Sequence, residues 1–263
     1  MMSPTGAGET RADEHGLGAD ESRPRRRVLI SGGTSGIGRA CAQYRSFRGD
    51  QVWVLGTSPD GVDAARAEIS LAGASVCDVS IESDVEAALE AARQVMGGID
   101  GVFVNAGIDG QALPASQLDV AHFRRVLDVN VLGAFLVARA ALRVSPPPSA
   151  VVFNASVNAL RPELNFLDYN ASKAAVVSMA KSLAMELSGQ GVTVTAVCPG
   201  YFPTRMSAPY IDDPAIRDEL LARIPAGRFG RLEEIAALVD FLLGPQAAFM
   251  GGSIVSIDGG AGI

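Results

Sequence analysis

Short apolar runs alternate along the chain with longer stretches of helical spacing. Seven of these runs have the length and composition of buried strands, and they cover residues 28–30, 51–55, 74–77, 101–104, 150–153, 193–197 and 253–257. Alanine-rich stretches with helical spacing lie between them, among them 83–95, 120–129, 131–142, 171–187 and 232–243. Strands that alternate with helices predict a doubly wound, Rossmann-like α/β domain with a seven-stranded, mostly parallel sheet and helices on both faces.

The first two dozen residues differ from the rest of the chain. Residues 1–24 are rich in Gly, Glu, Asp and Arg and contain almost no apolar residue after Met2, so we expect a disordered tail. This segment lacks the apolar stretch of a secretory signal, and its acidic residues are atypical of a transit peptide. No linker interrupts the pattern after residue 25, so residues 25–263 are predicted to form one domain.

Composition and charge exclude several classes of function. The formal net charge of −7 gives no basic surface for nucleic acid and little attraction to an anionic membrane. The three cysteines form neither a disulfide framework nor a C-x-x-C pair, and free thiols are typical of a reducing cytoplasm. The only histidines, His15 and His122, argue against a histidine-ligated metal and a Ser-His-Asp hydrolase. We therefore expect a cytoplasmic protein with no metal, nucleic-acid or membrane partner.

A glycine-rich turn follows the first predicted strand directly and opens a helix. Residues 31–38 read Ser-Gly-Gly-Thr-Ser-Gly-Ile-Gly. Glycines bring the backbone close to a bound group, and the first N–H groups of the helix then face an anion such as a pyrophosphate. A glycine turn can also merely end a strand, and the spacing here is not the commoner G-x-G-x-x-G. Its place in a βαβ unit nevertheless favours a dinucleotide site at the carboxyl ends of the strands.

Tyr169 and Lys173 lie four residues apart at the start of a predicted helix, so their side chains share one face. A free phenol, with a pKa near ~10, is a poor acid–base catalyst at neutral pH. A neighbouring ammonium lowers that pKa and brings the phenol closer to the working pH. Such a pair suits proton transfer to an alcohol oxygen, although Y-x-x-x-K also arises by chance on exposed helices.

Taken together, the motifs resemble those of the short-chain dehydrogenase/reductase family, in its compact single-domain branch, from about Arg27 to the C-terminus. Ser31 stands where the family usually has threonine in its cofactor turn. The other matches to the family pattern are Gly32, Gly36-Ile37-Gly38, Asn105-Ala106-Gly107, Asn130, Ser156, Tyr169, Lys173, Pro199-Gly200, Thr204 and Asp258-Gly259-Gly260.

The resemblance implies a catalytic set of Asn130, Ser156, Tyr169 and Lys173. Tyr169 would carry the substrate proton, and Lys173 would lower the pKa of Tyr169 and bind the nicotinamide ribose. Ser156 would hold the carbonyl oxygen and Asn130 a relay water. The implied cofactor-binding set is Gly32, Thr34, Ser35, Gly36, Ile37, Gly38, Thr57, Ser58, Asp78, Val79, Asn105, Ala106, Gly107, Tyr169, Lys173, Pro199, Gly200 and Thr204. Structural roles remain open, since Ser156 could end a strand, Asn130 could satisfy a helix kink and Asp78 could cap a helix.

The end of the second strand bears on which nicotinamide cofactor is used. An acid there would bind the ribose 2′-hydroxyl of NAD, whereas a basic residue would accept the 2′-phosphate of NADP. Gly56 occupies the position of the acid, and Thr57 and Ser58 can donate hydrogen bonds to a phosphate. Arg39 is a candidate counter-charge. NADP(H) is therefore favoured over NAD(H).

The sequence predicts an NAD(P)-dependent oxidoreductase that interconverts a carbonyl and a secondary alcohol on a small molecule, and that forms a homodimer or homotetramer. A catalytically silent nucleotide-binding scaffold and a sugar-nucleotide-modifying enzyme are the alternatives. Three features depart from the family pattern: Asn154 inside the fifth strand, Arg45 and Ser46 in the first helix, and the polar segment 161–168 before Tyr169. Because that segment faces the substrate in the family, we expect a polar substrate.

Overall fold

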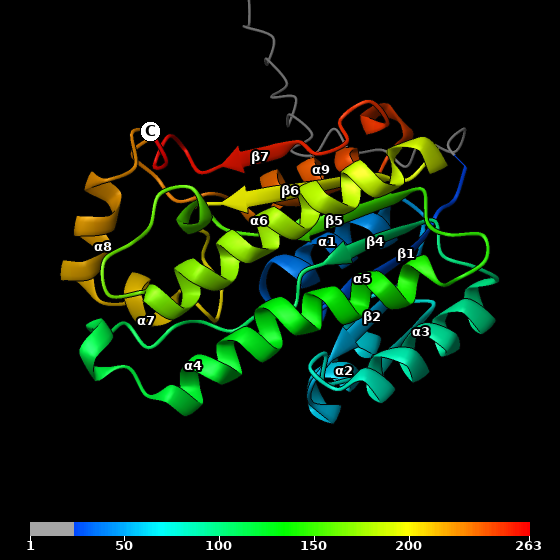
Figure 1. The fold of residues 1–263 in the computed structure, drawn as a ribbon, viewed down its shortest axis with the longest axis horizontal. Coiled ribbons are helices and arrows are strands. Elements are labelled where there is room, and N and C mark those ends of the chain that lie inside the picture. The colour runs from blue at the N-terminus through cyan, green and yellow to red at the C-terminus, as the bar shows by residue number, and fades with distance from the viewer. Residues whose placement is uncertain (1–23) are drawn as a thin grey trace, which may run out of the picture.

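The computed structural model describes residues 24–263, so the expected tail lies almost entirely outside the described residues. Seven strands form one sheet with the order β3-β2-β1-β4-β5-β6-β7, and every neighbouring pair is parallel (Figure 1). Their bounds are β1 Arg27–Ser31, β2 Gln51–Gly56, β3 Gly73–Val76, β4 Gly101–Val104, β5 Ala150–Asn154, β6 Thr193–Pro199 and β7 Ile254–Ile257. Each predicted strand overlaps one of these, which confirms the predicted fold class.

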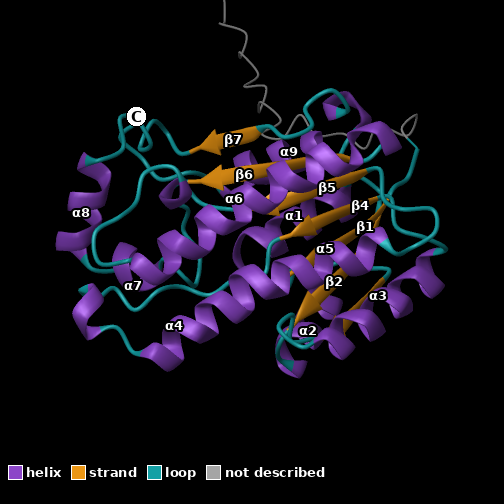
Figure 2. Cartoon of the chain, viewed as in Figure 1, coloured by secondary structure: helices purple, strands orange, loops and turns teal. Residues whose placement is uncertain are grey.

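Helices cover both faces of the sheet (Figure 2). Their bounds are α1 Gly36–Phe47, α2 Pro59–Glu68, α3 Glu82–Met96, α4 Val120–Leu127, α5 Ala134–Leu142, α6 Leu167–Leu187, α7 Ala208–Ile211, α8 Pro214–Ala222 and α9 Leu232–Leu242. One buried cluster joins the sheet to α1, α2 and α9, and another joins the opposite face to α3, α5 and α6. The central strands are buried on both faces, which explains their continuous apolar runs. None of the described helices is long and apolar enough to cross a membrane.

Two helices differ in their starting points from the sequence prediction. The segment Asp128–Gly133 forms a π-helical turn, so α5 begins only at Ala134. Helix α6 begins at Leu167, one turn before the predicted start, and this turn includes Asp168 and Tyr169. The residues of that turn are mostly polar, so apolar periodicity gave no signal for a helix there.

Arg45, which interrupts the apolar face of α1, is buried in an ion-pair cluster. Only 1% of its side chain is exposed, and its guanidinium lies 2.9 Å from the Asp50 carboxylate, itself 1% exposed. A second ion pair joins Arg45 to Asp240 on α9. The charge therefore ties α1 to α9 within the core, because a buried charge needs partners.

Candidate active site

A cavity of about 870 Å³ opens at the carboxyl ends of the strands. Its walls come from the loops after β1, β4, β5 and β6 and from the segment 204–223, which includes α7 and α8. The strand order reverses between β1 and β4, and this switch point is where open parallel sheets bind ligands. The predicted site residues in its walls are Gly32, Ser35, Gly36, Ile37, Asn105, Ala106, Gly107, Ser156, Tyr169, Lys173, Pro199, Gly200 and Thr204.

The glycine turn has the geometry of a phosphate cradle. Gly36 has a φ of +51°, and a Cβ atom on it would lie 3.3 Å from the Thr204 side chain. Ser35 precedes α1 without capping it through its side chain, and the first turn of α1 contains no acidic residue. The N–H groups at this helix start are therefore left for an anion. These features fit the pyrophosphate of a nicotinamide dinucleotide.

Asn105 holds the glycine turn against the centre of the sheet. Its Nδ2 donates hydrogen bonds to the carbonyl oxygens of Ser31 (3.0 Å) and Gly32 (3.1 Å). Its Oδ1 accepts a 2.8 Å hydrogen bond from Asn154 Nδ2. A Cβ on Gly38 would lie 2.5 Å from Asn105 Nδ2, so this position requires glycine. The Nδ2 of the unexpected amide in β5 thus has a partner, while its buried Oδ1 accepts no hydrogen bond from the described residues.

Tyr169 and Lys173 lie side by side on the first turns of α6. Lys173 Nζ lies 5.5 Å from the centre of the Tyr169 ring and donates a 3.0 Å hydrogen bond to the Asn154 carbonyl oxygen. Lys173 is 4% exposed, and burial lowers its pKa to about 8. Burial also raises the pKa of Tyr169, and the charges of Asp109 and Glu163 add to the rise. The direction for Tyr169 is therefore opposite to the one expected from the lysine alone.

Ser156 follows β5 and begins a short 3₁₀ turn, Val157–Ala159. Its Oγ accepts a 3.1 Å hydrogen bond from the Asn158 N–H, so its own hydroxyl proton stays able to donate. Ser156 and Tyr169 line the same cavity, and interaction with Ser156 opposes the rise in the pKa of Tyr169. Ser156 therefore lies in the turn that follows the strand and also lines the cavity.

Asn130 lies in the π-helical turn and is 1% exposed. Its Oδ1 accepts a 2.8 Å hydrogen bond from the Ile108 N–H, and its Nδ2 donates to the Ile108 carbonyl and to Ser172 Oγ, both at 3.0 Å. The side chain thus braces the loop after β4 against α6 and is not part of the cavity wall.

The remaining predicted cofactor residues lie outside the cavity wall. Ser58 caps α2 through a 3.1 Å hydrogen bond from the Gly61 N–H, while Thr57 is exposed. Asp78 pairs with Arg125 at 3.0 Å, and hydrogen bonds from Ser80 and Arg125 hold the pKa of this carboxyl below its usual range. Three further predicted residues, none of them in the wall, are Thr34, Gly38 and Val79.

The residues of the polar segment before Tyr169 differ in their positions and contacts. Glu163 and Asn165 line the cavity. Arg161 instead donates hydrogen bonds to the carbonyl oxygens of Ala261 (2.7 Å) and Ile263 (3.0 Å), which fixes the C-terminal segment. Asp168 is fully buried and accepts a 2.9 Å hydrogen bond from the Tyr169 N–H.

Among the cavity residues that were not singled out from the sequence are Asp109, Tyr201, Tyr210 and Arg223. Asp109 follows the Asn105-Ala106-Gly107 motif, and its Oδ2 accepts a 2.8 Å hydrogen bond from the Tyr210 hydroxyl. Glu163 accepts hydrogen bonds from the Tyr201 hydroxyl (3.0 Å) and from Arg223 (3.2 Å). The position of Asp109 just past a strand end was the one available signal. Within residues 24–263, no cluster of three or more His, Cys, Asp or Glu side chains could hold a metal ion.

Comparison with known proteins gives one consistent family. A family model described as enoyl-(acyl carrier protein) reductase matches residues 32–262. Levodione reductase from Leifsonia aquatica is 34% identical over 247 residues, which cover 89% of this chain and 92% of that protein. A crystal structure of levodione reductase aligns with a TM-score of 0.84 over 90% of this chain and 97% of that chain, at 34% identity.

Two further solved structures contain nicotinamide cofactors. The 3-ketoacyl-(acyl-carrier-protein) reductase from Brucella melitensis, complexed with NADH, has a TM-score of 0.81 at 31% identity and covers 90% of this chain and 98% of that chain. An actinorhodin polyketide ketoreductase with NADPH has a TM-score of 0.84 at 28% identity and covers 90% and 97%.

The parallel sheet, the glycine turn and the Tyr–Lys pair together define a nicotinamide-binding oxidoreductase fold. The chain belongs to the short-chain dehydrogenase/reductase family. It is an NAD(P)-dependent oxidoreductase that interconverts carbonyl and alcohol groups on small-molecule substrates.

Proposed function

We propose that this enzyme reduces a ketone on a small polar metabolite, with Ser156, Tyr169 and Lys173 as its catalytic residues. The observation that carries the proposal is the convergence of these three side chains in one cavity with the glycine turn. The nicotinamide, when bound, supplies the hydride for reduction and accepts it for oxidation. Gly32, Ser35, Gly36 and Ile37 would hold its pyrophosphate, with Thr204 closing over the opposite side.

Each catalytic residue has a task that follows from its contacts. Ser156 donates its hydroxyl proton as a hydrogen bond to the substrate carbonyl oxygen, since its acceptor side is occupied by Asn158. Tyr169 gives its proton to the same oxygen as the alcohol forms. Lys173 uses one of its three donors on Asn154, and the other two can bind ribose hydroxyls. Asn130 steadies the loop after β4, and the π-helical turn around it is our candidate for holding a relay water.

The protonation states favour Tyr169 as a proton donor. Its raised pKa keeps the phenol protonated at neutral pH, which is the form required for carbonyl reduction. In the oxidation direction the phenol must first lose its proton, and the positive charge of the Lys173 ammonium favours that loss. We therefore infer that Tyr169 is in the form needed for reduction at neutral pH, and that the rate of oxidation rises with pH.

Replacing Tyr169 with phenylalanine tests the assignment. Tyr169→Phe removes the proton donor while keeping the ring, so turnover on a panel of ketones should fall at least ~100-fold. Binding of the reduced cofactor, measured by fluorescence titration, should be retained. Undiminished turnover would refute the mechanism. Cofactor binding by the unaltered enzyme without turnover of any carbonyl or alcohol would instead favour the catalytically silent scaffold.

We infer that NADP(H) is preferred over NAD(H). A Cβ atom at Gly56 would lie 2.8 Å from Thr34 Oγ1, so the packing at the end of β2 leaves no space for an acidic side chain. The exposed Thr57 and neighbouring Ser58 can donate hydrogen bonds to a 2′-phosphate. Arg39, which pairs with Glu68, is the candidate counter-charge. A higher kcat/KM with NADPH than with NADH supports this inference, and the reverse order refutes it.

We further propose a homodimer or homotetramer in the cytoplasm. Phe249 and Ile263, at the start and end of the C-terminal segment, are almost fully exposed in the single chain. Burial of such side chains in a subunit interface is favourable. The free, buried thiols of Cys41, Cys77 and Cys198 suit a reducing compartment. Light scattering that shows only a monomer would overturn the proposed assembly.

A further inference from the structure

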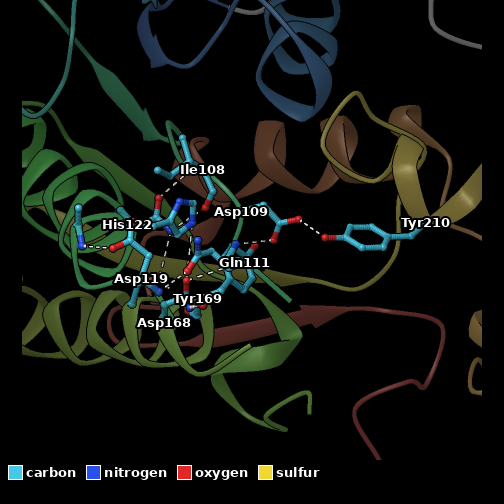
Figure 3. A network of polar contacts seen from close by, with 12 residues as sticks. Ile108, Asp109, Gln111, Asp119, His122, Asp168, Tyr169 and Tyr210 are labelled. Carbon is cyan, nitrogen blue, oxygen red and sulfur yellow. Dashed lines mark hydrogen bonds and ion pairs between the residues drawn. The ribbon is translucent and has the colours of Figure 1, made fainter. Parts of the chain in front are cut away.

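Asp109 lies in the cavity and takes no part in the mechanism above. Its Oδ1 accepts a 2.9 Å hydrogen bond from the Gly110 N–H, and its Oδ2 accepts the 2.8 Å bond from the Tyr210 hydroxyl on α7. Figure 3 shows this carboxylate pointing toward Tyr210, on the side of the loop away from His122. The same loop packs on the catalytic tyrosine, because a Cβ on Gly110 would lie 3.2 Å from Tyr169 Cβ. The loop that carries Asp109 thus packs against Tyr169, and both residues line the same cavity.

Two negative charges, those of Asp168 and Glu163, act on Asp109. Burial raises the pKa of its carboxyl, and the charges of Asp168 and Glu163 raise it further. Asp109 and Glu163 in turn raise the pKa of Tyr169. The cation on the same side of the cavity, Arg223, is paired with Glu163 at 3.2 Å and with Glu219 at 2.6 Å.

The other two lining cations are Lys173 and Arg205. Lys173 donates to the Asn154 carbonyl and also interacts with the charge of Asp109, while Arg205 is exposed to solvent. A substrate carbonyl next to Tyr169 therefore meets hydrogen-bond acceptors and negative potential on its Asp109 side. Such surroundings stabilise a donor group and repel an anion.

We propose that Asp109, held by Tyr210, accepts a hydrogen bond from a hydroxyl on the carbon next to the reacting carbonyl. The substrate class is then an uncharged α-hydroxy ketone, with a vicinal diol as its reduced form, rather than an α-keto acid. This inference rests on the proposed function, since it places the substrate carbonyl at Tyr169. It adds a specificity-determining residue to the site.

Four ketones of similar size test the proposal. Hydroxyacetone carries the hydroxyl, butanone an apolar methyl group, aminoacetone an ammonium and pyruvate a carboxylate at the corresponding position. The enzyme is expected to show at least ~10-fold higher kcat/KM for hydroxyacetone than for butanone, because a hydrogen bond to a half-buried carboxylate discriminates by about this factor. Pyruvate should be the poorest of the four, since its carboxylate would lie against Asp109.

The variant Asp109→Asn keeps the shape of the side chain and removes its charge. It should lower kcat/KM for hydroxyacetone about 10-fold, change that for butanone by less than about 3-fold, and raise that for pyruvate. Damage to the fold cannot produce the gain on pyruvate. The matched control is Asp119→Asn, because Asp119 caps α4 outside the cavity and asparagine caps equally well. This control should match the unaltered enzyme on all four ketones.

Three results would overturn the proposal. The first is an equal loss on hydroxyacetone and butanone in Asp109→Asn, which would indicate a structural role. The second is a preference of the unaltered enzyme for pyruvate or butanone over hydroxyacetone. The third is a preference for aminoacetone, which would show that the carboxylate selects an ammonium. Retained turnover in Tyr169→Phe would instead refute the proposed function, so the two failures are distinguishable.

Discussion

Replacing Arg45 with methionine tests how much the buried ion-pair cluster stabilises the packing of α1 on α9. Methionine matches the length of the arginine stem but removes its charge, so the Asp50 carboxylate, 2.9 Å away and 1% exposed, stays buried without this partner. Breaking a buried pair in this way costs about 3–5 kcal/mol. That is a large part of the ~5–15 kcal/mol by which a typical domain is stable.

Urea unfolding followed by circular dichroism at fixed protein concentration measures the effect. Arg93→Met is the matched control, since Arg93 pairs with Glu90 at 2.7 Å but both side chains are more than 40% exposed. This control variant should lower the free energy of unfolding by no more than about 1 kcal/mol. Arg45→Met combined with Asp50→Asn should recover part of the loss, because the second change neutralises the buried carboxylate that faced Arg45. A loss below about 1 kcal/mol for Arg45→Met would show that the cluster contributes no more than a surface pair.

Three further predictions concern the site. Burial lowers the pKa of Lys173 to about 8 in the native protein, whereas the lysine of the unfolded chain keeps its proton up to about pH 10. Between about pH 8 and 10 the unfolded state therefore binds more protons than the native state. The free energy of unfolding then rises with pH, by at most about 3 kcal/mol. Urea unfolding between pH 7 and 10.5 should show this slope in the unaltered protein and not in Lys173→Met; parallel profiles would contradict it. Gly56→Asp alone should weaken binding of both cofactors, because the new side chain collides with Thr34. Gly56→Asp combined with Thr34→Ala should shift the ratio of kcat/KM values toward NADH at least ~10-fold. An unchanged ratio would count against the inference that the lack of an acid at position 56 favours NADPH. Gly38→Ala, forced against Asn105, should lower the melting temperature and cofactor affinity together, and normal values of both would refute the required close packing.

Local patterns were sufficient to predict the sheet. The strands are apolar over their whole length because helices cover both faces, and this made 101–104 and 150–153 recognisable without any tertiary information. The glycine turn and the Tyr169–Lys173 pair were also predictable, because their chemistry depends on short spacings within one segment. Both now line the same cavity.

The substrate side of the cavity could not be predicted in the same way. Asp109 and Tyr210 are more than a hundred residues apart, and Tyr210 lies on a helix of four residues that has no measurable periodicity. The π-helical turn at Asn130 gave no separate signal, because its apolar pattern continues that of the neighbouring helices. Arg45 was noted only as an exception in an apolar face, since its partner Asp240 comes from a helix almost two hundred residues later.

The hydrogen bonds of Asn105 have a consequence for how the two halves of the site can be altered. They run from the glycine turn through Asn154, whose own carbonyl accepts the bond from Lys173 Nζ. We therefore expect a change at the pyrophosphate end to affect the catalytic lysine as well, so that affinity for the cofactor and the rate of reaction change together there. Gly56 and Thr57, at the end of β2, lie outside this series of bonds. Cofactor preference can therefore be altered at Thr57 while the proton-transfer geometry is left as it is, whereas a side chain at Gly56 also presses on Thr34 of the glycine turn.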